Sequence, residues 1–158
     1  MHNKRSSYLG FPLIIALFSG CSTAPEQPSS QPLAPNRLIE QAEDSSAKGN
    51  YVSAAQNYLQ LAQKSSHSKR QTYLLAAATI LVRGQNIDHA NSVMAQINPA
   101  MLRPQDQLQY RFTRARIALY EQQPEAALEQ LHLPSSNIPL AEIQTWHTLR
   151  ADAYTMSG

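Results

Sequence analysis

Hydrophobic residues recur at helical spacing through most of the chain, between short groups of helix-breaking residues. The clearest example is residues 51–64, in which apolar side chains stand at offsets of 0, 3, 4, 7, 8 and 11. These positions are Tyr51, Ala54, Ala55, Tyr58, Leu59 and Ala62. This spacing places all six side chains on one face of a helix.

Six further segments show comparable patterns, so the sequence predicts seven helices and an all-α fold. The other helices are expected over residues 36–47, 68–83, 87–97, 104–122, 124–131 and 139–156. Ser68 suits a helix N-cap, and Pro104 and Pro124 suit a first helical turn. The apolar faces expected for three of these helices are Ile87, Ala90, Val93, Met94 and Ile97; Leu108, Phe112, Ala115 and Leu119; and Ile143, Trp146, Leu149 and Ala153.

A small residue recurs three places into the second helix of each predicted hairpin. It stands at Ala54, Ala90 and Ala127, at intervals of 36 and 37 residues. Paired helices that approach closely need a small residue there, and the period is near the ~34 residues of tetratricopeptide repeats. Gly49 and Gly84 mark the first two turns. We therefore expect a tetratricopeptide-like helical-hairpin solenoid over residues 36–158, with a plain seven-helix bundle as the alternative.

The same register places Gly158 at the turn of a fourth hairpin. A repeat cannot bury its apolar face alone. The helix that contains Trp146 and Leu149 is then expected to stay half covered. We therefore expect the sequence to be a fragment of a longer protein, with a further domain downstream.

The first 20 residues have the layout of a secretory signal. Lys4 and Arg5 precede an apolar run of eleven residues, 8–18. A membrane-spanning helix needs about 20 apolar residues, so this run is too short to be one, but it matches a signal peptide. Residues 1–20 are therefore predicted to be removed.

The run ends in Phe18-Ser19-Gly20-Cys21, which resembles the lipobox of bacterial lipoproteins. The resemblance implies cleavage between Gly20 and Cys21 and lipidation of Cys21. Ser22, which is not Asp, implies delivery to the outer membrane. The alternative is an ordinary signal peptide followed by a chance Cys or a small buried thiol.

Residues 21–35 are expected to form a linker after the lipidated Cys. Residues 22–35 hold four Pro, four Ser or Thr and one charged residue. Such a composition cannot bury enough apolar surface to offset its backbone entropy. We expect a disordered tether that separates the helical domain from a membrane.

The amino-acid composition favours helices and argues against nucleic-acid binding and intrachain disulfides. Ala and Leu occur 21 and 18 times and Val three times, which favours helix over sheet. The formal charge is +2, and it becomes zero without residues 1–20, with 11 basic and 11 acidic residues. This gives no electrostatic reason to expect nucleic-acid binding. One Cys excludes an intrachain disulfide framework.

No group of residues carries a catalytic, metal-ligating or cofactor-binding pattern. The histidines are isolated from one another, and Gly-rich phosphate loops and nucleophile motifs are missing from the sequence. We therefore expect a protein that is not an enzyme. Arg103, Arg111, Arg114 and Arg116 form one basic cluster, suited either to an acidic protein partner or phospholipid head groups, or to solvated positions on the solenoid. The residues that contact a partner stay unknown.

Residues 71–131 resemble the amino-terminal region of the LpoA-type lipoprotein activators of class A penicillin-binding proteins. The likeness consists of a Leu/Ala-rich helix, a Gly turn, a helix with Ala90 and Val93-Met94, a stop at Ile97-Asn98-Pro99, and a long Arg/Ala-rich helix. It covers roughly residues 38–158. In that family a periplasmic-binding-protein-like domain follows and docks on the synthase.

This resemblance implies a non-catalytic outer-membrane lipoprotein that faces the periplasm and reaches through the peptidoglycan. It would bind and activate a class A penicillin-binding protein, a bifunctional peptidoglycan synthase. The alternative is a solenoid lipoprotein that serves as an adaptor for outer-membrane or pilus assembly.

Overall fold

The computed structural model describes residues 34–158, and every regular element in this part of the chain is a helix. It contains seven α-helices and three short 3-10 helices. These are α1 (Pro35–Ala47), α2 (Tyr51–Gln63), α3 (His67–Arg83), α4 (Ile87–Met94), η1 (Pro99–Met101), α5 (Pro104–Tyr120), α6 (Pro124–Gln130), η2 (Ser135–Asn137), η3 (Leu140–Glu142) and α7 (Ile143–Ser157). The all-α prediction is confirmed.

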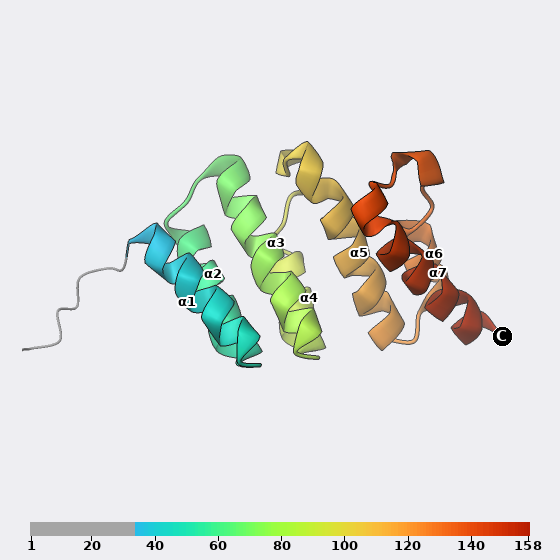
Figure 1. Ribbon diagram of the computed structural model, residues 1–158, viewed down its shortest axis with the longest axis horizontal. Helices are drawn as coiled ribbons and strands as arrows, with labels where there is room; N and C mark the ends of the chain where they lie inside the picture. Colours follow the sequence, from blue (N-terminus) through green and yellow to red (C-terminus); the bar gives the residue numbers. More distant parts are fainter. Residues whose placement is uncertain (1–33) are drawn as a thin grey trace, which may run out of the picture. The chain divides into compact units, whose positions relative to one another are not determined.

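The helices pair into antiparallel hairpins that stack in chain order (Figure 1). Helices α1 and α2, α3 and α4, and α5 and α6 contact each other as hairpins. Helix α3 also contacts α2 and α5, while α7 packs against both α5 and α6. Each element therefore contacts near neighbours in sequence, as in a helical-hairpin solenoid.

The three hairpin turns share one backbone conformation. Gly49, Gln85 and Gln122 have φ values of 78°, 58° and 57°. The next amide donates to a carbonyl five residues earlier in every case. These bonds are Asn50 N to Ser45 O (2.8 Å), Asn86 N to Leu81 O (2.9 Å) and Gln123 N to Ala118 O (2.8 Å). This is the Schellman arrangement, which ends a helix by means of one left-handed residue. Gly158 takes a φ of 88° at the same place in the register.

Gly84 lies at the second turn, as expected, but it is not the left-handed residue there. Its φ is −82°. A Cβ atom at Gly84 would stand 2.6 Å from the Cβ of Tyr51, the first residue of α2. The glycine is therefore needed for the close approach of α3 to α2, while Gln85 makes the turn.

The predicted small residues lie within the packed interior of each hairpin. Ala54, Ala90 and Ala127 are completely buried. The amide of each donates to the carbonyl of the residue that precedes its helix, at 3.0–3.1 Å. A side chain larger than a methyl group would push the two helices apart. The period read from these three residues is confirmed.

Several predicted helix ends are wrong, because short-range turns replace the last helical residues. Helix α4 ends at Met94, and i to i−3 bonds then close the chain through Ile97, which remains buried. The last helix begins at Ile143, because η3 precedes it. Ser68 lies inside α3, and Ser66 occupies the N-cap position instead.

Helix α5 is buried on two sides, whereas its pattern predicted one apolar face. Phe112 and Ala115 are buried, as expected, but Leu108 and Leu119 are only half-buried. Ile117 belongs to the hydrophobic cluster formed mainly by α2, α3 and α4. Phe112, Ala115 and Ala118 belong to the cluster shared with α6 and α7. Helix α5 therefore joins the two clusters.

Hydrogen bonds between polar side chains close the seam between α3 and α5. Thr79 and Thr113 share a hydrogen bond of 3.0 Å between their hydroxyls. Thr72 Oγ1 donates to Asp106 Oδ2 at 2.6 Å, and Arg103 Nε donates to the same oxygen at 2.9 Å. The bonds from Arg103 and then Thr72 hold the pKa of Asp106 below its ordinary value, against the effect of burial.

The close approach at Ala90 predicts a penalty for enlargement. Ala90→Leu is expected to lower the free energy of unfolding by about 1–3 kcal/mol, because the added atoms have no space. Urea unfolding followed by far-ultraviolet circular dichroism measures the change. Ala151→Leu, at an exposed position of α7, serves as the control and should change stability little. Equal effects in the two variants would contradict the close approach.

The Asp106 seam predicts a stability difference that depends on pH. Asp106→Asn is expected to cost about 1.5–3 kcal/mol at pH 7, because it weakens hydrogen bonds to a charged group. The folded pKa is lowered, so this contribution is present above the unfolded value of about 3.9 and is lost as the pH falls through the folded pKa.

Urea midpoints of both proteins at pH 7 and at about pH 3 check this, since the difference between them should shrink at the lower pH. Asp44→Asn removes a carboxylate from an exposed ion pair with Lys48, of 2.7 Å. It should cost about 0–1 kcal/mol. A difference for Asp106→Asn that is the same at both pH values would contradict the assignment.

Candidate functional site

The predicted cleavage and lipidation residues, Gly20 and Cys21, lie outside the residues that the structure describes. The same holds for the signal at residues 1–20 and for most of the linker at 21–35. Between residues 34 and 158, each helix is too short or too polar to cross a bilayer.

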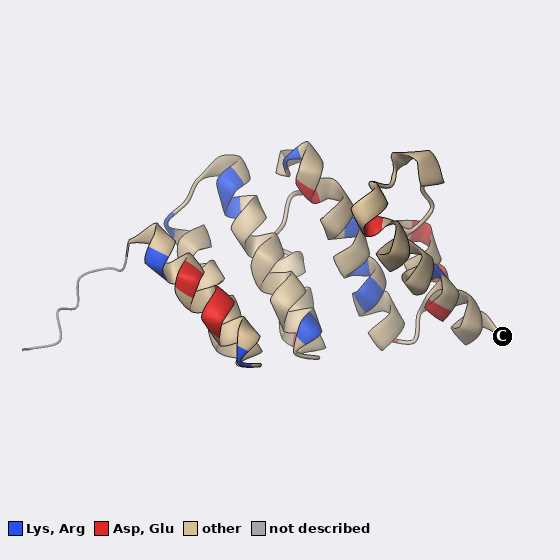
Figure 2. Ribbon diagram, in the orientation of Figure 1, with Lys and Arg blue, Asp and Glu red and all other residues tan. Residues whose placement is uncertain are grey.

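The four arginines of the predicted basic cluster have different surroundings. Arg103 pairs with Asp106 at 2.9 Å. Arg111 is half-buried and Arg114 is exposed, both on α5. Arg116 is half-buried and lines a groove. Figure 2 shows basic residues along α5 and acidic residues along α1, so charges of both signs are distributed over the array.

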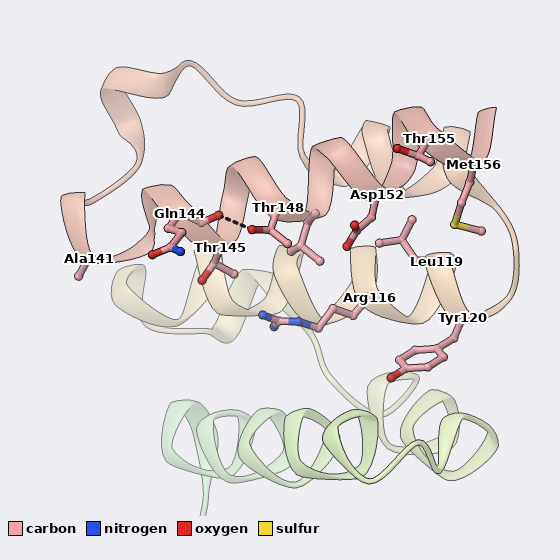
Figure 3. A pocket seen from close by; sticks show the side chains of 11 residues that line it. Arg116, Leu119, Tyr120, Ala141, Gln144, Thr145, Thr148, Asp152, Thr155 and Met156 are labelled. Atoms are coloured by element: carbon pink, nitrogen blue, oxygen red, sulfur yellow. Dashed lines mark hydrogen bonds between the residues drawn. The ribbon is translucent and has the colours of Figure 1, made fainter. Parts of the chain in front are cut away.

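The groove lies between α5 and α7 and has a volume of about 760 Å³. Helix α5 contributes three side chains to it, and η3 and α7 contribute the rest (Figure 3). The lining residues are Arg116, Leu119, Tyr120, Ala141, Gln144, Thr145, Thr148, Leu149, Asp152, Thr155 and Met156. In contrast to the α3–α5 seam, no side-chain hydrogen bond joins α5 to α7 in the part of the chain described.

The position of α7 explains why the groove is open. Trp146 is buried, and its Nε1 donates to the carbonyl of Leu131 at the end of α6, at 3.0 Å. Leu149 and Ala153 are also buried and belong to the same cluster as Ala127. Helix α7 is therefore fixed to α6 by its apolar face, and the side that borders the groove is mainly polar but includes Leu149 and Met156.

Arg116 is the one basic side chain among the lining residues. The ion pairs found in residues 34–158 are Lys48–Asp44 and Arg103–Asp106, so Arg116 has no carboxylate at salt-bridge distance. Burial lowers the pKa of Arg116, and the nearby charge of Glu142 opposes this effect in part, while Arg83 adds to it. The guanidinium is thus partly desolvated without a bonded anion.

The other lining residues give the groove two different ends. Figure 3 shows the Arg116 guanidinium directed toward the end where Gln144 and Thr145 lie, and Asp152 nearer to Leu119. Thr148 Oγ1 donates to the Gln144 carbonyl at 3.0 Å, so its oxygen can still accept a hydrogen bond. One end is therefore cationic and polar, and the other holds apolar side chains beside a carboxylate.

The histidines of the described part lie apart. His132 follows the end of α6 at Gln130, and His67, His132 and His147 are exposed. Residues 34–158 contain no group of three His, Cys, Asp or Glu that could hold a metal ion.

The sequence pattern did not identify the groove, although Arg116 belongs to the basic cluster that it singled out. The α7 residues that face Arg116 are mostly Thr, Gln and Ala, which carry no motif. The groove arises from the placement of α7 on α6. Its only sequence signal is a basic residue on a helix face that also carries Leu119 and Tyr120.

Comparisons with known proteins agree with the resemblance seen in the sequence. The family model described as "LppC putative lipoprotein" matches residues 48–158. The chain is similar to the penicillin-binding protein activator LpoA of Vibrio cholerae serotype O1, from strains O395, M66-2 and MJ-1236. Each is 27% identical over an alignment 158 residues long, and the alignment covers 98% of this chain.

The chain spans about a quarter of the length of these curated relatives, 24%. No solved structure matches it. The family model covers well over half of the chain and includes all the helices from α2 to α7. The chain therefore belongs to the LppC lipoprotein family.

Proposed function

We propose that this chain is the helical-repeat part of a non-catalytic lipoprotein that activates a class A penicillin-binding protein. The observation that carries the proposal is the similarity to penicillin-binding protein activators over 98% of the chain. The fold supports it, because a solenoid of hairpins offers extended surfaces for protein binding.

The proposal includes attachment to the outer membrane. Residues 1–20 serve as the signal, Cys21 carries the lipid, and residues 21–35 form the linker. Acyl chains contribute about 0.8 kcal/mol per buried CH₂, so several chains hold a protein on a membrane firmly. The domain then faces the periplasm and meets a synthase of the inner membrane across the peptidoglycan. Activation follows if the lipoprotein binds the active conformation of the synthase more tightly than the inactive one.

The first test is a pull-down from solubilised envelopes with the mature full-length protein as bait and mass spectrometry of the captured proteins. Recovery of a class A penicillin-binding protein is expected. The purified pair should then show faster glycan polymerisation and crosslinking than the synthase alone. Recovery of outer-membrane or pilus assembly components without a synthase would contradict activation and favour an adaptor.

The anchor is tested separately by Cys21→Ser. This variant is expected to remain an uncleaved precursor and to disappear from outer-membrane fractions, because the thiol that receives the lipid is absent. Immunoblots of separated inner and outer membranes measure both effects. A serine substitution at an exposed residue of the array, Ala151→Ser, is the control. Unchanged outer-membrane attachment of Cys21→Ser would rule out the anchor.

A further inference from the structure

The groove between α5 and α7 differs from the rest of the described surface in one respect. It holds a half-buried guanidinium that has no carboxylate at salt-bridge distance within the described residues, next to apolar side chains that are exposed in this part of the chain. Tyr120 and Met156 keep 48% and 43% of their surface exposed. A partly desolvated cation is stabilised by an anion that bonds to it, and an Arg side chain binds carboxylates in a bidentate manner.

We propose that this groove binds an extended segment of a partner protein that presents an Asp or Glu side chain and, a few residues away, an apolar side chain. The carboxylate pairs with Arg116, and the apolar side chain packs on Leu119 and Met156. This goes beyond activation of a synthase, because it assigns the surface and the chemistry of the segment, whichever protein supplies it.

The dimensions of the groove set the spacing of that segment. From Thr145 to Met156, α7 rises about 16 Å at 1.5 Å per residue. An extended peptide covers this length with about five residues at ~3.3 Å each. The acidic and apolar residues of the segment are therefore expected about three to five positions apart, because that spacing matches the length of the groove.

The groove also sets the direction of the segment. The guanidinium of Arg116 is directed toward Gln144 and Thr145, whereas Asp152 lies nearer to Leu119 (Figure 3). A ligand carboxylate at the Asp152 end would meet a like charge inside the groove, whereas Glu142, whose charge also acts on Arg116, is not among the lining residues. This disfavours binding in the reverse direction. Hydroxyl and amide groups on α7 can bond to the peptide backbone, as main-chain recognition requires.

The test is a selection of displayed random peptides of about 12 residues, longer than the groove, on the immobilised full chain. Sequencing of the bound pool is expected to show Asp or Glu paired with an apolar residue three to five positions away, relative to the starting library. Synthetic peptides from this pool are then titrated by fluorescence anisotropy. The library contains no synthase, so this test can fail while activation holds, and the reverse is equally true.

Two variants and a matched control identify the site. Arg116→Ala is expected to weaken peptide binding about tenfold or more, because a charge-assisted hydrogen-bonded pair is lost. Arg114→Ala removes a charge from the same helix at an exposed position outside the groove, and its binding should equal that of the wild type within about twofold. Thr148→Glu places a carboxylate in the groove at an exposed position, so it should weaken binding even if Arg116→Ala disturbs folding.

Thermal unfolding of all variants separates a loss of binding from a loss of structure. The proposal is overturned if the selected peptides carry no acidic preference or if none are enriched. It is also overturned if folded Arg116→Ala and Thr148→Glu bind as well as the wild type, or if Arg114→Ala weakens binding as much as Arg116→Ala does.

Discussion

The close approach of the two helices in each hairpin, at a fully buried alanine, is the constraint on which the array depends. A Schellman turn with one left-handed residue sets the angle between the helices, and Ala54, Ala90 or Ala127 then allows contact. The turn and the alanine recur at the same intervals, so the hairpins have nearly the same geometry. Equal hairpins can stack in one direction, and their stacking buries the apolar faces that a single hairpin would leave exposed.

This constraint explains which features the sequence could predict. A buried methyl group at a helix contact tolerates little variation, so the 36- and 37-residue intervals are visible in one sequence. The left-handed residue tolerates more, because glutamine occupies it at Gln85 and Gln122 at an energetic cost of about 1–2 kcal/mol. Glycine was therefore an incomplete guide to the turns. The groove at Arg116 was not predictable, because it depends on how α7 packs on α6. The bond from Trp146 to the Leu131 carbonyl holds α7 there, and it joins two residues that share no sequence motif.

The groove has a property that the proposed activation requires, namely the ability to bind two states of a partner with different affinities. A regulator that makes no bonds itself acts only through the difference between its affinities for two states of its partner. A groove with a cationic end and an apolar end can provide such a difference, because a segment has to be extended and correctly oriented to satisfy both ends. Family membership indicates what class of protein this is, while the groove gives one surface where recognition can occur.

Helix α5 contributes Ile117 to the first hydrophobic cluster and Phe112 to the second, so two neighbours share one rigid rod. Rotation of that rod toward α7 would withdraw Ile117 from α3, because close-packed interiors cannot stretch to fill the gap. The two hydrophobic clusters thus depend on the position of the same helix, α5. A change in the packing of α5 on one cluster therefore alters its packing on the other, because both clusters pack on the same helix.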